Sequence, residues 1–222
     1  MLSHMLRAVE KTPPIPDVFE FIGSSTGEGE AAGAVISLTL PTMSAGDLAV
    51  VYLGQDGSLG NNTPDTWTTP SGWTLLAIET TSDSYAGNSA VYYKFMSGTP
   101  DTTFDFDSGG STTRQQVSAI CYAFSGASTP TFTVATGISG LPNNPSISTA
   151  SGNYVIAFAT LDDDEPSLSA LSGYSEYLQN DLTSGTIFGC IKLVTTTTED
   201  PPAYSGSGND QWVAITVNIP PL

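Results

Sequence analysis

Apolar and polar residues alternate in short runs along the chain from about residue 18 onward. The runs DVFEFIG (17–23) and AVISLTL (34–40) alternate with a period of two, which is typical of strands that have one buried face. The run GDLAVVYLG (46–54) is continuously apolar, which indicates a strand covered on both faces or at the centre of a sandwich. Glycine and proline clusters separate the runs, and no ten-residue stretch has a convincing helical period. The pattern predicts an all-β fold.

The second half of the chain repeats the order of runs found in the first half. In this register Trp73 corresponds to Tyr174 and Lys94 to Lys192, and we expect the two lysines to occupy equivalent strands. Each ammonium can reach a nearby carboxylate while its stem lies along apolar neighbours. Four matches in the same order indicate a degenerate duplication. The matched segments are SAGDLAVVYL (44–53) with ASGNYVIAFA (150–159), PSGWTLL (70–76) with LSGYSEYL (171–178), SAVYYKFM (89–96) with GTIFGCIKLV (185–194), and QVSAICYAF (116–124) with QWVAITVNI (211–219).

These patterns favour one β-sandwich domain over residues 18–222, with one repeat at about 18–127 and the second at about 128–222. Two tandem immunoglobulin-like sandwiches are the alternative. The shared sandwich is favoured because the link between the repeats contains a strand-like run, TFTVATG (131–137). We therefore expect an antiparallel two-sheet sandwich of jelly-roll type with about 12–14 strands.

Residues 1–17 are expected to form a short, extended N-terminal arm. The arm holds two of the five basic residues, Arg7 and Lys11, followed by Pro13, Pro14 and Pro16, which break helices and favour extended chain. Two interpretations stay open: a disordered terminus, and an assembly arm that grips a neighbouring subunit.

The charge balance restricts the classes of partner. The chain has 22 acidic and 5 basic residues, with a formal net charge of −17, so it would repel a phosphate backbone or an anionic membrane surface. Nucleic acid is therefore not an expected partner. We also expect no signal peptide and no transmembrane segment, because the N-terminus lacks an apolar core and no apolar run approaches about 18 residues.

Candidate catalytic and metal-binding residues are few. The single histidine, His4, lies in the arm, which argues against a serine or cysteine triad in the folded body. A pair of acids could serve glycoside hydrolysis, but none is embedded among aromatic residues in a way that marks a catalytic acid. The candidates for such a pair are Asp101, Asp105 and Asp107, then Asp162, Asp163, Asp164 and Glu165. We therefore expect no enzymatic activity and no cofactor. The run LDDDEP is a weak Ca²⁺ candidate through Asp162, Asp163, Asp164 and Glu165, with a solvated loop as the favoured alternative.

Cysteine and tryptophan positions complete the set of candidates. Cys121 and Cys190 both lie in apolar runs and are predicted to be buried free thiols. Trp67 lies in NNTPDTWTTPSG (61–72), a segment rich in turn residues, and an exposed tryptophan there would be a ligand-contact candidate. The alternative for Trp67 is a ring that plugs the end of the sandwich. Trp73 and Trp212 lie in repeated strands, where core packing is expected.

The order GDL–apolar run, PSGWTLL, VYYKFMSGTPDTTFDF and QVSAICYAFSGA, followed by a second copy ending in WVAITVNIPP, resembles a known group of proteins. The group comprises duplicated β-sandwich domains of tailed-bacteriophage structural proteins and related bacterial surface proteins, and the resemblance covers residues 44–220. It implies a non-enzymatic virion protein, made in the host cytoplasm: a capsid decoration (cement) protein, a head fibre or a receptor-binding protein. Its implied partners are capsid or tail proteins, further copies of itself with a trimer as one form, and a host surface glycan. A carbohydrate-binding module and a bacterial adhesin are the alternatives.

Overall fold

The computed structural model describes residues 18–28, 35–55, 67–81, 87–107, 117–162, 168–182 and 185–222. These residues form antiparallel β-strands and no helix, so the predicted all-β class is confirmed. Within the described ranges there is accordingly no helix of the length and apolarity that a membrane crossing requires. The predicted N-terminal arm, residues 1–17, lies outside the described residues.

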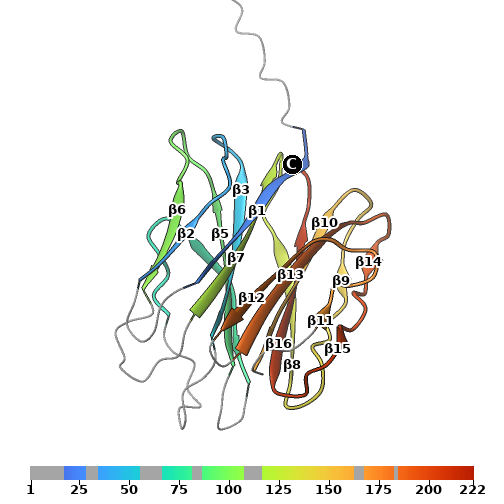
Figure 1. Cartoon of the computed structure of the whole chain (residues 1–222). Coiled ribbons are helices and arrows are strands. Elements are labelled where there is room, and N and C mark those ends of the chain that lie inside the picture. The colour runs from blue at the N-terminus through green and yellow to red at the C-terminus, as the bar shows by residue number, and fades with distance from the viewer. Residues whose placement is uncertain are drawn as a thin grey trace, which may run out of the picture.

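Two five-stranded sheets form the centre of the molecule (Figure 1). All strands of the first sheet precede residue 126, and all strands of the second sheet follow residue 130. In spatial order the first sheet contains β1 (Glu20–Glu28), β7 (Val117–Ser125), β3 (Leu48–Gln55), β5 (Asn88–Phe95) and β4 (Thr74–Thr80). The second contains β12 (Ser175–Leu182), β13 (Gly185–Leu193), β10 (Tyr154–Leu161), β16 (Trp212–Ile219) and β8 (Thr131–Gly137).

The inner faces of the two sheets pack against each other and share one apolar core. Tyr52 of β3 stacks on Phe158 of β10, with ring centroids 4.7 Å apart. The Tyr52 hydroxyl lies 2.9 Å from the Ser89 hydroxyl and 2.6 Å from that of Thr160, so a buried hydroxyl cluster joins the two sheets. Because these hydroxyls bond one another, the sheets meet without leaving them unsatisfied.

Smaller sheets cover the outer faces, which the two-sheet prediction did not include. On the first sheet, β2 (Val35–Thr39) pairs with β6 (Thr103–Asp107). On the second sheet, β9 (Ile147–Ser148) pairs with β14 (Thr198–Glu199), and β11 (Leu168–Ser169) pairs with β15 (Ser205–Gly206). Apolar side chains from these pairs join cores on the outer sides of the large sheets. Strands β3 and β10 are thus buried on both faces, as the continuous apolar run at residues 46–54 predicted for β3.

The two halves place corresponding strands in the same order. Reading β1-β7-β3-β5-β4 against β8-β16-β10-β13-β12 aligns the four strand pairs that the sequence register matches, namely β7 with β16, β3 with β10, β5 with β13 and β4 with β12. Strand β1 is set against β8, and β2–β6 against β9–β14, by place in the fold alone. Lys94 and Lys192 lie in β5 and β13, which occupy equivalent places, as predicted. At one edge of the sandwich β1 contacts β12, and at the other edge β4 contacts β8. In the aligned orders, the first strand of each sheet therefore lies beside the last strand of the other sheet.

Both ends of the described chain are held at the end of β7. The Ser125 hydroxyl donates to the carbonyl of Val18, and the Leu222 amide donates 2.9 Å to the carbonyl of Gly126. Figure 1 accordingly shows the C-terminus beside the start of β1.

Candidate functional site

A lysine, a carboxylate and an aromatic ring meet at the end of β5. Lys94 Nζ lies 2.5 Å from an Asp101 carboxylate oxygen and 6.0 Å from the centroid of the Trp73 ring. A tight turn presents the ring: the Trp73 amide donates to the Pro70 carbonyl at 3.1 Å, and Gly72 adopts a φ of 80°, which favours glycine. The ammonium is thus neutralised by a carboxylate and lies within cation–π range of an indole.

The second half contains the corresponding arrangement at the end of β13. Lys192 Nζ lies 2.7 Å from Glu199 Oε1 and 5.5 Å from the Tyr174 ring centroid. The Tyr174 hydroxyl donates to the same oxygen at 3.1 Å. Burial, with the negative charge of Glu199 as the next cause, raises the pKa of Tyr174 far above its usual value. Glu199 itself is only 5% exposed, so the lysine and the phenol supply the partners that a buried carboxylate requires.

Both lysines are therefore structural groups that tie the end of a strand to the segment seven residues later. The sequence analysis expected a nearby carboxylate for each lysine, and the structure identifies Asp101 and Glu199. Trp73 is buried, as predicted for a core residue.

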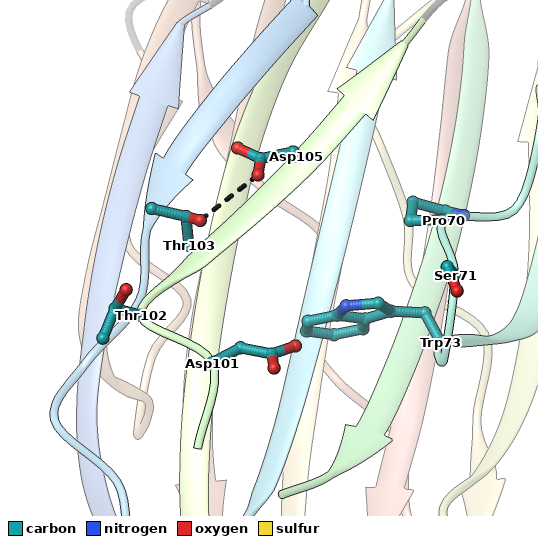
Figure 2. A pocket seen from close by; sticks show the side chains of 7 residues that line it. All are labelled: Pro70, Ser71, Trp73, Asp101, Thr102, Thr103 and Asp105. Atoms are coloured by element: carbon teal, nitrogen blue, oxygen red, sulfur yellow. Dashed lines mark hydrogen bonds between the residues drawn. The ribbon is translucent and has the colours of Figure 1, made fainter. Parts of the chain in front are cut away.

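A pocket of about 350 Å³ opens beside the first of these groups (Figure 2). Asp105 in this pocket accepts hydrogen bonds from Ser37 Oγ at 2.6 Å and from Thr103 Oγ1 at 3.3 Å. A second pocket of about 380 Å³ shares Asp101 and Thr102 with it. Hydroxyls, two carboxylates and an indole edge are groups that can bind a polyol. The pocket is lined by Pro70, Ser71, Trp73, Asp101, Thr102, Thr103 and Asp105.

Trp67 is not the exposed ring that the ligand-contact interpretation requires. Only 7% of its surface is exposed, and its ring meets that of Phe106 in β6 edge to face at 5.3 Å. The alternative, a ring that plugs the sandwich, describes its position in the outer core of the first half.

The remaining candidates fall mostly outside the described residues. The arm residues Arg7, Lys11, Pro13, Pro14 and Pro16 lie there, as do Asp163, Asp164 and Glu165 of the calcium candidate. Asp162 is described, and its amide donates to the Gln211 carbonyl at 2.9 Å. Among the described residues, no three histidine, cysteine or acidic side chains group in a way that could hold a metal ion.

Cys121 and Cys190 are free and buried, as predicted. Cys121 belongs to the outer core of the first sheet and Cys190 to that of the second, so the central sandwich separates them. Burial raises the pKa of Cys121 far above its usual value and that of Cys190 to about 12. Both are therefore protonated thiols at neutral pH and poor nucleophiles.

Sequence reasoning missed the pocket residues Ser71, Thr102 and Thr103. No local pattern marks them, because the pocket forms only where the turn before β4 lies beside the start of β6. Searches against protein-family models, curated proteins and solved structures find no match to the chain.

Proposed function

We propose that this chain is a non-enzymatic structural protein of a bacteriophage virion, acting as a capsid decoration or head-fibre protein. The observation that carries the proposal is the extent to which the two sheets are fixed against each other. Tyr122 donates to the Glu176 carbonyl at 2.7 Å, and Thr81 donates to Gln211 at 2.8 Å. Together with the shared core and the buried hydroxyl cluster, these bonds make a stiff body suited to display on a particle.

The surroundings of the two lysines and two cysteines described above support the same proposal. The lysines of both strand ends are paired with carboxylates, and the two thiols are buried and protonated. A net charge of −17 keeps such a body dispersed and away from other acidic surfaces. The sequence resemblance to phage structural proteins points to the particle on which the body would act.

The fold proposal is a single domain over residues 18–222, of jelly-roll type, that arose by duplication. Matching strand orders in the two large sheets support the duplication, and so do the two lysine–carboxylate–aromatic groups with the same seven-residue spacing. The inner core shared by both halves supports treating them as one domain.

Quantitative analysis of purified virions tests this function. We expect the protein at a fixed stoichiometric copy number, and we expect the isolated chain to co-sediment with particles that lack it. A chain without residues 1–17 should keep its circular dichroism spectrum and lose co-sedimentation. Absence from purified virions would contradict the proposal, and binding undiminished by arm removal would contradict the role of the arm.

A carbohydrate-binding function is the second candidate, favoured by the pocket of Figure 2. A bound sugar would change the environment of the Trp73 indole, so glycan titration should shift the intrinsic fluorescence. Asp105→Asn should weaken binding by about tenfold, since a hydrogen bond to a charged group is lost. Asp107→Asn is the control, because it changes the same strand outside the pocket. Fluorescence that no glycan changes, or equal effects of the two variants, would exclude this candidate.

A further inference from the structure

Three of the four edge strands of the central sandwich carry features that oppose pairing with another chain. Strand β1 has glutamates at both ends and a register shift between Phe21 and Gly23. Strand β4 has a shift between Leu75 and Ala77 and carries Glu79. Strand β12 has a shift between Ser175 and Leu178. It also carries two acidic residues, one of which, Glu176, has a φ of 51°. Charges and bulges are the devices by which edge strands avoid edge-to-edge association.

The fourth edge strand, β8, has none of these features. Its sequence, TFTVATG, contains no charged residue and no proline, and it pairs with β16 through all seven residues without a register shift. Phe132 and Val134 are 41% and 37% exposed, although they lie opposite Val217 and Ile215 of the inner core. A regular, neutral edge rich in Thr, Val and Phe is a template for strand addition.

Neighbouring side chains hold this edge in place. Thr133 Oγ1 donates to the Ser146 carbonyl at 3.2 Å on the outer face. Trp212 packs so closely over Gly137 that a Cβ there would come within 2.3 Å of the ring, and its Nε1 donates to the Ser139 carbonyl at 3.2 Å. The strand is therefore preformed, which lowers the entropy cost of docking.

We propose that β8 is the docking edge for a second copy of this chain, which adds its own β8 in antiparallel orientation about a two-fold axis. The two five-stranded C-terminal sheets would then form one continuous sheet. Chain charge favours a second copy as the occupant. A basic partner would be drawn to the acidic edges β1, β4 and β12, whereas two copies with a net charge of −17 each repel least at an edge strand without charged residues.

The strand is also complementary to itself. In the register centred on Thr133, Phe132 of each copy lies opposite Val134 of the other copy, on the face that continues the inner core. Aromatic and β-branched residues are favourable cross-strand pairs, and two such pairs form in one dimer. This proposal concerns the isolated chain and does not depend on the virion function.

The test is the oligomeric state of the full chain by analytical ultracentrifugation from micromolar concentration up to about 100 µM. We expect a dimer at the upper end. Val134→Lys should raise the dissociation constant by about 100-fold or more, because it removes both Phe–Val cross-strand pairs and places two ammonium groups diagonally across the axis. Leu193→Lys is the control: it replaces an exposed apolar residue of β13, beside the opposite edge strand β12, and should leave the dimer intact.

Each other outcome overturns the proposal. A monomer at the highest concentration, an assembly with an odd number of copies, a dimer unaffected by Val134→Lys, or equal dissociation in both variants would each contradict it. If Val134→Lys loses its native circular dichroism spectrum, Thr133→Lys provides a second test, because Thr133 lies opposite its own copy in this register. Amide hydrogen exchange supplies an independent measurement, since β8 amides should become protected as concentration rises and those of β1, at the opposite edge of the sandwich, should not.

Discussion

Replacing Gly54 with alanine tests the face-to-face packing of the two large sheets. Gly54 lies in β3 of the first sheet, and a Cβ at this position would lie 2.2 Å from Ile187 Cγ2 and 2.5 Å from Thr160 Oγ1. Both contacted atoms belong to the second sheet and to β-branched side chains, which cannot swing away freely. The added methyl group therefore forces the sheets apart or displaces both side chains.

The expected loss follows from these contacts. Inserting one carbon into a close-packed interior costs about 1–3 kcal/mol. Thr160 Oγ1 also bonds the hydroxyls of Tyr52 at 2.6 Å and Ser89 at 2.9 Å, so its displacement disturbs the buried hydroxyl cluster as well. A gain of about 0.4–1 kcal/mol from the less flexible unfolded chain opposes the loss. We therefore expect the free energy of unfolding to fall by about 1–3 kcal/mol and the melting temperature by about 2–12 °C.

Urea denaturation and differential scanning calorimetry measure both quantities. Gly98→Ala is the control, because no heavy atom lies within 4 Å of the carbon it adds, and its stability should match or slightly exceed that of the parent. Ile187→Leu removes the Cγ2 atom while conserving volume, so it should restore part of the loss in the double variant. If Gly54→Ala is as stable as Gly98→Ala, the described packing of the sheets is wrong.

Four further predictions concern side chains already described. Lys192→Met should lower the unfolding free energy by about 2–3 kcal/mol, because it leaves the buried Glu199 carboxylate without its cation. Lys94→Met should lower it by about 1 kcal/mol or less, because its partner Asp101 is more exposed. Equal losses of the two variants in urea titrations would refute this. Burial raises the pKa of Cys190 from 9.0 to about 12, so the folded state keeps a proton that the unfolded chain loses. The contribution of this thiol to the unfolding free energy should be constant below pH 9 and decline above it, by at most about 1.4 kcal/mol per pH unit. A urea midpoint that does not decrease as the pH is raised from 8 to 10.5 would contradict this. Native Cys121 and Cys190 should not react with a thiol reagent, and both should react in denaturant; rapid labelling of the native chain would count against their burial. Trp67→Ala should lower the unfolding free energy by about 3–5 kcal/mol, and a neutral effect would show that the ring is not a core group.

The features that sequence predicted are those set by local pattern. The continuous apolar run at residues 46–54 identified β3 as a central strand, because a strand buried on both faces has no polar face to display. The register of the two halves placed Lys94 and Lys192 in equivalent strands, since each lies near the end of a matched segment. Apolar neighbours likewise marked both cysteines as buried.

The features that sequence missed depend on which elements meet. Alternation along β6 shows that one face is buried, but it does not show that this face covers the outer side of the first large sheet. The sequence left both exposure and burial open for Trp67, because its burial depends on packing against distant residues such as Phe106, almost 40 residues away. The pocket beside Trp73 likewise requires two distant segments to lie together.

The anchoring of both described chain ends at the end of β7 has a consequence for connectivity. Val18 and Leu222 bond to Ser125 and Gly126, which are adjacent in sequence. The two ends of the described chain therefore lie close enough to be joined by a short linker. A circular permutant that links residue 222 to residue 18 through a short glycine-rich peptide, and opens at the exposed turn around Gly98, should keep the same pairing in every sheet. The strand pairing of the sandwich should therefore not depend on which loop holds the chain termini.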